Sequence, residues 1–484
     1  MRGRLFARLG AAIVALMLAS GPAGANEAEP ARWTAARHQP TAMKLVTWRD
    51  AAGADKPFAD YVRDTVAVLQ QARGPIEPDP ALAPSHAELV GPHQWPLDPA
   101  CGGTAKAGML LVHGLSDSPY LMRDVGDALA RLPGRCLLVR SILLPGHGGV
   151  PGDLIRPTAA EWQAALRYGI DSFAGEVPKV HLAGFSTGAA LALDLALNGA
   201  PPKVTLASLT LLSPSIGLTN RFPLHRIPYG FELFQAILTA FRGFGPEGAW
   251  LRIDEDLDFA KAESFPVMAP RPLMEVMTEV ERAKRPLTLP VLMAFSADDV
   301  TVDPQASLDF FRQRVENPAS RLLLFASPAT LAAHPDRYAR LDRDDSRVTC
   351  LRGTGPDDTG CAPPAAQPLP RCPFGSPAGI CVTRIGHNGV PVAPDNPHYG
   401  AAGDYRNCLG YATNQEWGKL CGCVTPTQRA ALPQCRTTQA ASGPLSFSEM
   451  TPEEMKKSDG LVIRIGFNPL FERTMAAVAA FLPE

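Results

Sequence analysis

The sequence lacks a surplus of charge of either sign, and it lacks any long apolar run. Its 484 residues include 46 Lys+Arg and 48 Asp+Glu, which gives a formal net charge of −2. A chain with no basic surplus is not a nucleic-acid-binding protein driven by phosphate charge. No apolar stretch reaches the roughly 18 residues that a membrane-spanning helix needs. The 46% hydrophobic and 19% charged residues are ordinary for a globular protein and exclude general disorder.

Cysteine is absent from the first 100 residues, so no Cys follows the N-terminal apolar stretch as it would in a lipoprotein. That stretch, residues 9–19, is preceded by Arg2, Arg4 and Arg8 and followed by the small-x-small sequence Ala-Gly-Ala at 23–25. This pattern predicts a secretory signal over 1–25 and a secreted or periplasmic protein. An uncleaved membrane anchor is the alternative, but the stretch is too short to span a bilayer.

All ten cysteines lie after residue 100, in three groups. They are Cys101 and Cys136; then Cys350, Cys361, Cys372 and Cys381; then Cys408, Cys421, Cys423 and Cys435. In an exported protein disulfides are the default, and Cys101 could pair with Cys136 because the two flank an expected strand–helix–strand unit. Pairing inside the other groups stays open. Four thiolates in the third group could bind zinc, but that group contains no Cys-x-x-Cys.

Short apolar runs alternate with helical stretches after residue 101, and this predicts an α/β fold: a mostly parallel sheet with helices on both faces. We expect an N-terminal helical and Pro-rich extension over 26–100 and the main domain over 101–484. We also expect a helical cap insertion over about 215–285, with an apolar helical face at 231–241. Cys-rich excursions are expected at about 327–379 and 400–442, with a strand over 380–385 and a closing helix over 471–482. We find no internal repeat and no nucleotide-type glycine loop.

The clearest chemical motif is Gly184-Phe185-Ser186-Thr187-Gly188, between a strand expected over 180–183 and a helix expected over 187–197. A serine at such a junction must turn sharply, and flanking glycines remove the Cβ clashes of that turn. The motif alone is common by chance, so its context decides. Here the context fits a nucleophile whose Oγ projects above the sheet at a helix N-terminus.

An oxyanion hole needs two backbone N–H donors. One comes from the residue after the nucleophile, Thr187, and the other from a loop after an earlier strand. His113-Gly114-Leu115-Ser116 follows the strand expected over 109–112. We therefore expect the N–H of Leu115 to be the second donor, and His113 to shape the loop rather than to transfer protons.

The acidic partner is expected after the strand over 291–295, where Asp298 and Asp299 are adjacent. The spacing to the β-branched Val302 favours Asp299, while Asp298 stays open and Asp303 is a remote alternative. The acid's task is to orient the histidine and stabilise its charged form.

The histidine should follow the acid in the chain, which leaves His334, His387 and His398. His387 is favoured because it follows the strand expected over 380–385 and lies between Gly386 and Asn388-Gly389, in a tight loop. His334 and His398 remain alternatives.

The segments VHGLSDSP, LLPGHG, HLAGFSTG and PVLMAFSADD resemble the α/β-hydrolase superfamily. They are similar in particular to its monoacylglycerol lipase, lysophospholipase and serine aminopeptidase-like branch, in a secreted bacterial form. The resemblance covers about residues 109–305. It implies a catalytic triad of Ser186, an Asp at 298 or 299, and His387, with Leu115 and Thr187 as oxyanion donors. The interval between acid and histidine is much longer than is usual in that family.

These observations predict a serine hydrolase that cleaves carboxylic esters through an acyl-enzyme on Ser186, with no metal and no cofactor. The substrate would be a small-molecule or lipid-like ester, and the apolar cap could also touch a membrane surface transiently. A thioesterase on the same scaffold is an alternative, as is a non-catalytic binding protein. An aminopeptidase would need acidic groups in the cap to hold an amine, for which the candidates are Glu263, Glu275, Glu279 and Glu281.

Overall fold

The computed structural model describes residues 36–41, 47–77, 81–218, 250–252, 256, 258–363, 368–370, 372–375, 381–401, 403, 405, 446–447, 462–463 and 466–483. All of them belong to one compact unit, Ala36–Glu484. Several expectations lie outside the described residues: the signal segment 1–25, the cap helix 231–241 and the third cysteine group.

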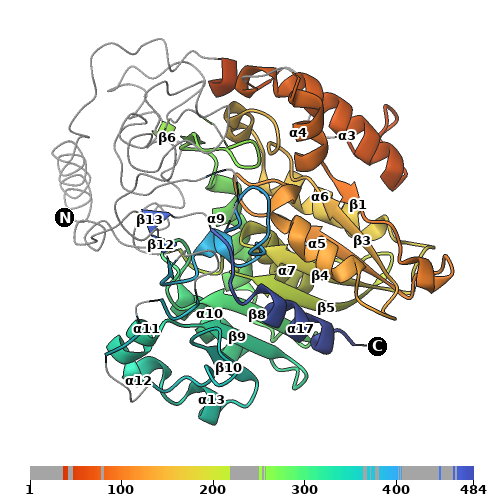
Figure 1. Ribbon diagram of the computed structural model, residues 1–484. Helices are drawn as coiled ribbons and strands as arrows, with labels where there is room; N and C mark the ends of the chain where they lie inside the picture. The colour runs from red at the N-terminus through yellow and green to blue at the C-terminus, as the bar shows by residue number, and fades with distance from the viewer. Residues whose placement is uncertain are drawn as a thin grey trace, which may run out of the picture. The chain divides into compact units, whose positions relative to one another are not determined.

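One eight-stranded sheet organises the chain, with the strand order β1-β3-β2-β4-β5-β8-β9-β10 (Figure 1). Every neighbouring pair is parallel except β1 and β3, which are antiparallel. The mostly parallel sheet expected from the sequence is therefore confirmed. The strands are β1 (His93–Gln94), β2 (Ala107–Val112), β3 (Leu137–Ile142), β4 (Lys179–Phe185), β5 (Thr205–Leu212), β8 (Val291–Ser296), β9 (Arg321–Phe325) and β10 (Val348–Leu351).

Helices cover both faces of this sheet, and the strand side chains alternate between two cores. In β8, Val291, Met293 and Phe295 enter one core, while Leu292 and Ala294 enter the other. This alternation explains why β2 and β8 are almost unbroken apolar runs, since a strand covered on both sides buries both sets of side chains. The first core includes α3 (Phe58–Ala72), α6 (Ala159–Asp171), α7 (Thr187–Asn198), α9 (Arg271–Arg282) and α10 (Pro304–Arg314); the second includes α5 (Arg123–Ala130) and α17 (Phe471–Phe481).

The N-terminal segment adds more regular structure than its proline content suggested. After α3, the Pro-rich stretch contains α4 (Ala83–Val90) and the edge strand β1. Tyr61 on α3 is buried, and its hydroxyl accepts a hydrogen bond from Leu143 N at 3.0 Å. These contacts attach the segment to the loop that follows β3.

The first expected excursion also contains elements that the sequence did not reveal. Residues 327–379 include the short helices α11 (Pro328–Ala333), α12 (Pro335–Tyr338) and α13 (Leu341–Asp344), and then the edge strand β10. Disulfides link Cys350 to Cys361 in this region and Cys101 to Cys136 near β2 and β3. The second pair is the one expected from its position around the strand–helix–strand unit.

The prediction of a strand over 380–385 is wrong in the length of the strand and in the sheet to which it belongs. The structure has only β11 (Cys381–Val382), which pairs in parallel with β12 (Ser446–Phe447) in a separate three-stranded sheet that also includes β13 (Val462–Ile463). The expected cap region likewise contains a two-stranded sheet, β6 (Trp250–Arg252) with β7 (Phe265–Pro266), and ends in α9, which packs against α6 and α7. Among the helices of the described ranges, none combines the length and apolar character of a bilayer span.

Candidate active site

The strand order places the candidate site at the carboxyl ends of β2 and β4. From β2 the chain adds β3 on one side and then β4 on the other, so the connections diverge at this point. Such a reversal leaves a crevice at the carboxyl ends of the strands, where ligands of α/β sheets bind. Val112 at the end of β2 is in register with Gly184 near the end of β4, so the loops that follow both strands are neighbours.

Ser186 occupies the turn between β4 and α7 in a strained backbone conformation. Its φ is 52° and its ψ is −110°, values that a non-glycine residue adopts only when its surroundings impose them. The flanking glycines are required by close backbone approach. A Cβ on Gly184 would lie 2.4 Å from the carbonyl of Gly188, and a Cβ on Gly188 would lie 2.2 Å from Val112 O. The glycines of the motif therefore allow the serine to sit at the start of the helix.

The structure brings Ser186, His387 and Asp299 together in one hydrogen-bonded chain. His387 Nε2 lies 3.0 Å from Ser186 Oγ, and His387 Nδ1 lies 2.7 Å from Asp299 Oδ2. All three residues are buried. Since a carboxylate only accepts, Nδ1 carries a proton and donates it to Asp299, and in the neutral ring Nε2 is left to accept from the Ser186 hydroxyl. His387 begins the short 3-10 helix η8 (His387–Gly389).

The two adjacent aspartates have different partners. Asp299 Oδ1 accepts hydrogen bonds from the backbone N–H groups of Thr301 at 2.8 Å and Val302 at 3.0 Å, which leaves Oδ2 for His387. Asp298 instead accepts from Ser327 N at 3.0 Å and from the hydroxyls of Ser327 and Thr330. Burial raises the pKa of Asp298, opposed by these hydrogen bonds and by Arg384. Asp299 thus faces the histidine, while Asp298 anchors the loop after β9.

The other two candidate histidines lie elsewhere. His334 is exposed at the end of α11. His398 is buried, and its Nε2 lies 3.1 Å from Asp258 Oδ1, a carboxylate that also accepts from the Tyr399 hydroxyl. Asp303 caps the N-terminus of α10 by accepting from Gln305 N. None of these three residues contacts Ser186 or His387 among the hydrogen bonds of the described chain.

Leu115 and Thr187, the two expected oxyanion donors, lie in the loop after β2 and in the first turn of α7. Within the described residues, neither backbone N–H has a hydrogen-bond acceptor. His113 shapes the first loop: its Nε2 accepts from Leu144 N at 3.0 Å, and its Nδ1 lies 2.8 Å from Gly114 O. Burial holds the pKa of His113 well below its ordinary value, so the ring is neutral at physiological pH.

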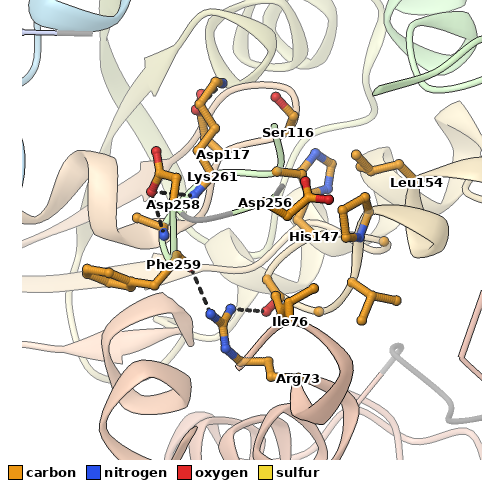
Figure 2. A pocket seen from close by; sticks show the side chains of 17 residues that line it. Arg73, Ile76, Ser116, Asp117, His147, Leu154, Asp256, Asp258, Phe259 and Lys261 are labelled. Atoms are coloured by element: carbon orange, nitrogen blue, oxygen red, sulfur yellow. Dashed lines mark hydrogen bonds and ion pairs between the residues drawn. The ribbon is translucent and has the colours of Figure 1, made fainter. Parts of the chain in front are cut away.

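Residues 258–264, which we call the strap, form hydrogen bonds to the same loop. Lys261 Nζ donates to Leu115 O at 3.2 Å and forms a partly buried ion pair with Asp117. Ala262 N donates to Ser116 O at 2.8 Å. Figure 2 shows Lys261, Asp117 and Asp258 gathered in the polar pocket beside this loop. The strap fixes the peptide groups on the C-terminal side of the Leu115 N–H, and no sequence pattern indicated it.

Arg73 and His147 also line this pocket. Arg73, the C-cap residue of α3, donates to Gly148 O at 2.7 Å and to Phe259 O at 3.0 Å (Figure 2), and it is paired with Glu77. His147 is buried, and burial lowers its pKa from 6.5 to about 4. The N-terminal segment therefore contacts the strap through the hydrogen bond from Arg73 to Phe259 O.

Sequence reasoning also missed Ser215, which lies just after β5. Its Oγ is 3.0 Å from Ser186 Oγ, and its N–H donates to Ser186 O at 3.2 Å. The only hint in the sequence is the Ser-Pro-Ser run at 213–215 after an apolar strand, which resembles an ordinary turn.

Comparison with known proteins agrees with this architecture. The profile of the alpha/beta hydrolase family matches residues 109–374, more than half of the chain. The protein therefore belongs to the alpha/beta hydrolase family.

The individual proteins that are similar to this chain match it over only part of its length or at low sequence identity. A thermostable monoacylglycerol lipase of Bacillus sp. (strain H-257) is 31% identical over 107 residues, a match that spans 21% of this chain and 42% of the relative. Similar solved structures include a monoacylglycerol lipase of Paleococcus ferrophilus, 18% identical with a TM-score of 0.36, covering 49% of this chain and 88% of that one. Another, described with the metagenome-derived lipolytic enzymes LipS and LipT, is 20% identical with a TM-score of 0.38 and covers 49% and 86% of the two chains.

Proposed function

We propose that this protein is a serine hydrolase that cleaves carboxylic esters. The observation that carries the proposal is the hydrogen-bonded chain from Ser186 through His387 to Asp299 at the carboxyl end of the parallel sheet. A serine is a weak nucleophile until a neighbouring base removes its proton, and here the base is within hydrogen-bond distance.

The first half of the reaction forms the acyl-enzyme. Ser186 Oγ attacks the ester carbonyl carbon while its proton moves to His387 Nε2. Asp299 accepts from Nδ1 and stabilises the imidazolium that forms. The carbonyl electron pair moves onto oxygen, and the N–H groups of Leu115 and Thr187 stabilise that oxyanion, helped by the N-terminus of α7.

The second half releases both products. His387 returns its proton to the alcohol oxygen, and the alcohol leaves as the carbonyl re-forms. Water then takes the place of the alcohol: it gives a proton to His387 and attacks the acyl carbon. His387 returns that proton to Ser186 Oγ as the bond between Oγ and the acyl carbon breaks, and the acid is released. Each proton transfer in this cycle passes through His387.

An ester is favoured over a peptide with a free amino terminus by the surroundings of four acidic residues. Glu275, Glu279 and Glu281 are exposed on α9, and Glu275 pairs with Arg271 while Glu279 pairs with Arg282. Glu263 accepts from the Tyr405 hydroxyl. Each of the four is therefore exposed to solvent or already paired, which disfavours it as a dedicated holder of a substrate amine. The name of the Bacillus relative, a monoacylglycerol lipase, supports a lipid-like ester as substrate.

We further propose that the protein is exported, with residues 1–25 as the signal and 26–100 as an extension of a hydrolase domain over 101–484. The Cys101–Cys136 and Cys350–Cys361 disulfides support this proposal because such bonds persist in oxidising compartments. N-terminal sequencing of the mature protein from the periplasm or medium would test it, and an N-terminus other than Asn26 would contradict the cleavage site.

The test of the proposed function is the Ser186→Ala variant, assayed on p-nitrophenyl esters of graded chain length and on aminoacyl anilides. Ester hydrolysis should fall by a factor on the order of 10⁴ to 10⁶, because the nucleophile is lost. Ser213→Ala is the matched control: Ser213 is also buried nearby, and its hydroxyl has no hydrogen-bond partner among the described residues. A fluorophosphonate that labels a residue other than Ser186, or turnover of the anilides but not the esters, would contradict the proposal.

A further inference from the structure

Two groups, not one, are hydrogen-bonded to the nucleophile. Ser186 Oγ lies 3.0 Å from His387 Nε2 and 3.0 Å from Ser215 Oγ. Ser215 has only 2% of its surface exposed, and its backbone N–H donates to Ser186 O, so the two residues are held together by main chain as well as side chain. The second hydroxyl is therefore a fixed part of the environment of Ser186.

The direction of this hydrogen bond follows from counting protons. Asp299 takes the proton on His387 Nδ1, which makes Nε2 an acceptor. The single proton of the Ser186 hydroxyl is then donated to Nε2. The bond between the two hydroxyls must consequently run from Ser215 as donor to Ser186 Oγ as acceptor.

We propose that Ser215 is a positioning residue for acyl transfer; this inference rests on the proposed function. Its hydroxyl fixes the rotamer of Ser186 with the proton toward His387 and leaves the remaining lone pair of Oγ for the substrate carbonyl. During attack the Ser186 proton goes to Nε2, the new bond forms between Oγ and the carbonyl carbon, and the carbonyl electron pair goes to the oxyanion. Ser215 keeps its own proton throughout and stabilises the negative charge that develops on Oγ.

The chain offers a close control for this role. Ser213 is two residues earlier in the same turn, is fully buried, and has a hydroxyl that lacks a hydrogen-bond partner in the described part of the chain. Its N–H donates to Ala294 O at 2.8 Å, a contact that an alanine would keep. Ser213→Ala and Ser215→Ala therefore remove the same atom from neighbouring buried sites, and only the second removes a contact with Ser186.

The experiment measures the acylation rate of wild type, Ser213→Ala, Ser215→Ala and Ser215→Thr with a p-nitrophenyl ester in single turnover, together with steady-state KM and the melting temperature. Loss of one hydrogen bond to a group that becomes charged should slow acylation by Ser215→Ala about tenfold or more. KM and melting should stay near the wild-type values. Ser213→Ala should acylate at the wild-type rate, and Ser215→Thr, which keeps a hydroxyl, should recover most of the loss.

Three results would overturn the role of Ser215 without touching the proposed function. Acylation of Ser215→Ala at the wild-type rate would show that the hydrogen bond between Ser215 and Ser186 does not contribute to acylation. A faster rate would show that Ser215 accepts the proton of Ser186 and holds the serine in an unproductive orientation. A folded Ser215→Thr protein as slow as Ser215→Ala would attribute the loss to packing. Failure of a fluorophosphonate to label Ser186 in the wild type would instead overturn both proposals.

Discussion

Replacing Asp299 with asparagine should disable the histidine while leaving its surroundings in place. Thr301 N and Val302 N both donate to Asp299 Oδ1. In Asp299→Asn these two donors hold the amide oxygen at the Oδ1 position, so the NH₂ group faces His387 Nδ1. The ring must then accept at Nδ1 and carry its proton on Nε2, where it cannot take the proton of Ser186.

The size of the loss in kcat follows from the free energy needed to reverse the orientation of the asparagine amide. To restore the productive tautomer, the amide has to flip and present NH₂ to the two backbone donors, which leaves both unsatisfied. A buried unsatisfied donor costs about 1–3 kcal/mol, so the flip costs about 2–6 kcal/mol. At 1.36 kcal/mol per factor of ten, kcat should fall by a factor of roughly 30 to 3 × 10⁴.

Asp298→Asn is the matched control because it makes the same chemical change one residue earlier. The asparagine oxygen can still accept from Ser327 N, and the residue makes no contact with His387 among the described hydrogen bonds. We expect its kcat to stay within about threefold of wild type, with any loss seen in the melting temperature. The assay is steady-state hydrolysis of a p-nitrophenyl ester, with melting followed in parallel. A larger kcat loss in Asp298→Asn than in Asp299→Asn would refute the assignment of the acid.

Three further predictions concern the supports of the site. Lys261→Met should lower kcat about tenfold with little change in KM, because the ammonium group no longer holds Leu115 O; unchanged kcat would show that the oxyanion loop is rigid without it. Replacing Cys101 and Cys136 with alanine opens a loop of 35 residues and should lower the unfolding free energy by about 4 kcal/mol, while the protein that remains folded keeps its activity; equal losses of both would contradict this. Burial raises the pKa of Asp124 from 3.8 to about 6, so the native state binds the extra proton between these values and stability falls as pH rises through about 6. Asp124→Asn should therefore raise the melting temperature at pH 8 but not at pH 4, and a loss of stability at pH 8 would count against it.

The parts of the fold that the sequence predicted are those determined locally. A strand covered by helices on both faces is apolar at most positions, so β2 and β8 are visible as short, almost unbroken apolar runs. The turn at Ser186 is visible because Gly184 and Gly188 meet backbone atoms that no Cβ could approach. Local sterics and burial leave a pattern that can be read without any knowledge of the rest of the chain.

The parts that were missed depend on distant partners. The edge strand β10 joins the sheet through β9, and its sequence, Val-Thr-Cys-Leu, is too short and mixed to predict a strand. Lys261 reaches Leu115 across 146 positions, and Ser215 reaches Ser186 across 29. Hydrogen bonds of this kind leave no periodicity in the sequence, because either partner alone resembles an ordinary surface or turn residue.

The position of His387 shows how a long insertion can precede a residue that must be placed to within a fraction of an ångström. The strand before it, β11, does not belong to the main sheet, so the sheet alone does not orient its loop. The loop is held from its other side: Asn468 N donates to Val392 O at 2.9 Å, and Asn468 Nδ2 donates to Val390 O at 3.1 Å. On the same stretch, Ala393 N donates to Asp124 Oδ2 at 2.8 Å, which ties the loop to α5. Because closing a longer loop adds only slowly to the entropic cost, the interval between Asp299 and His387 can grow as long as these anchors hold the histidine.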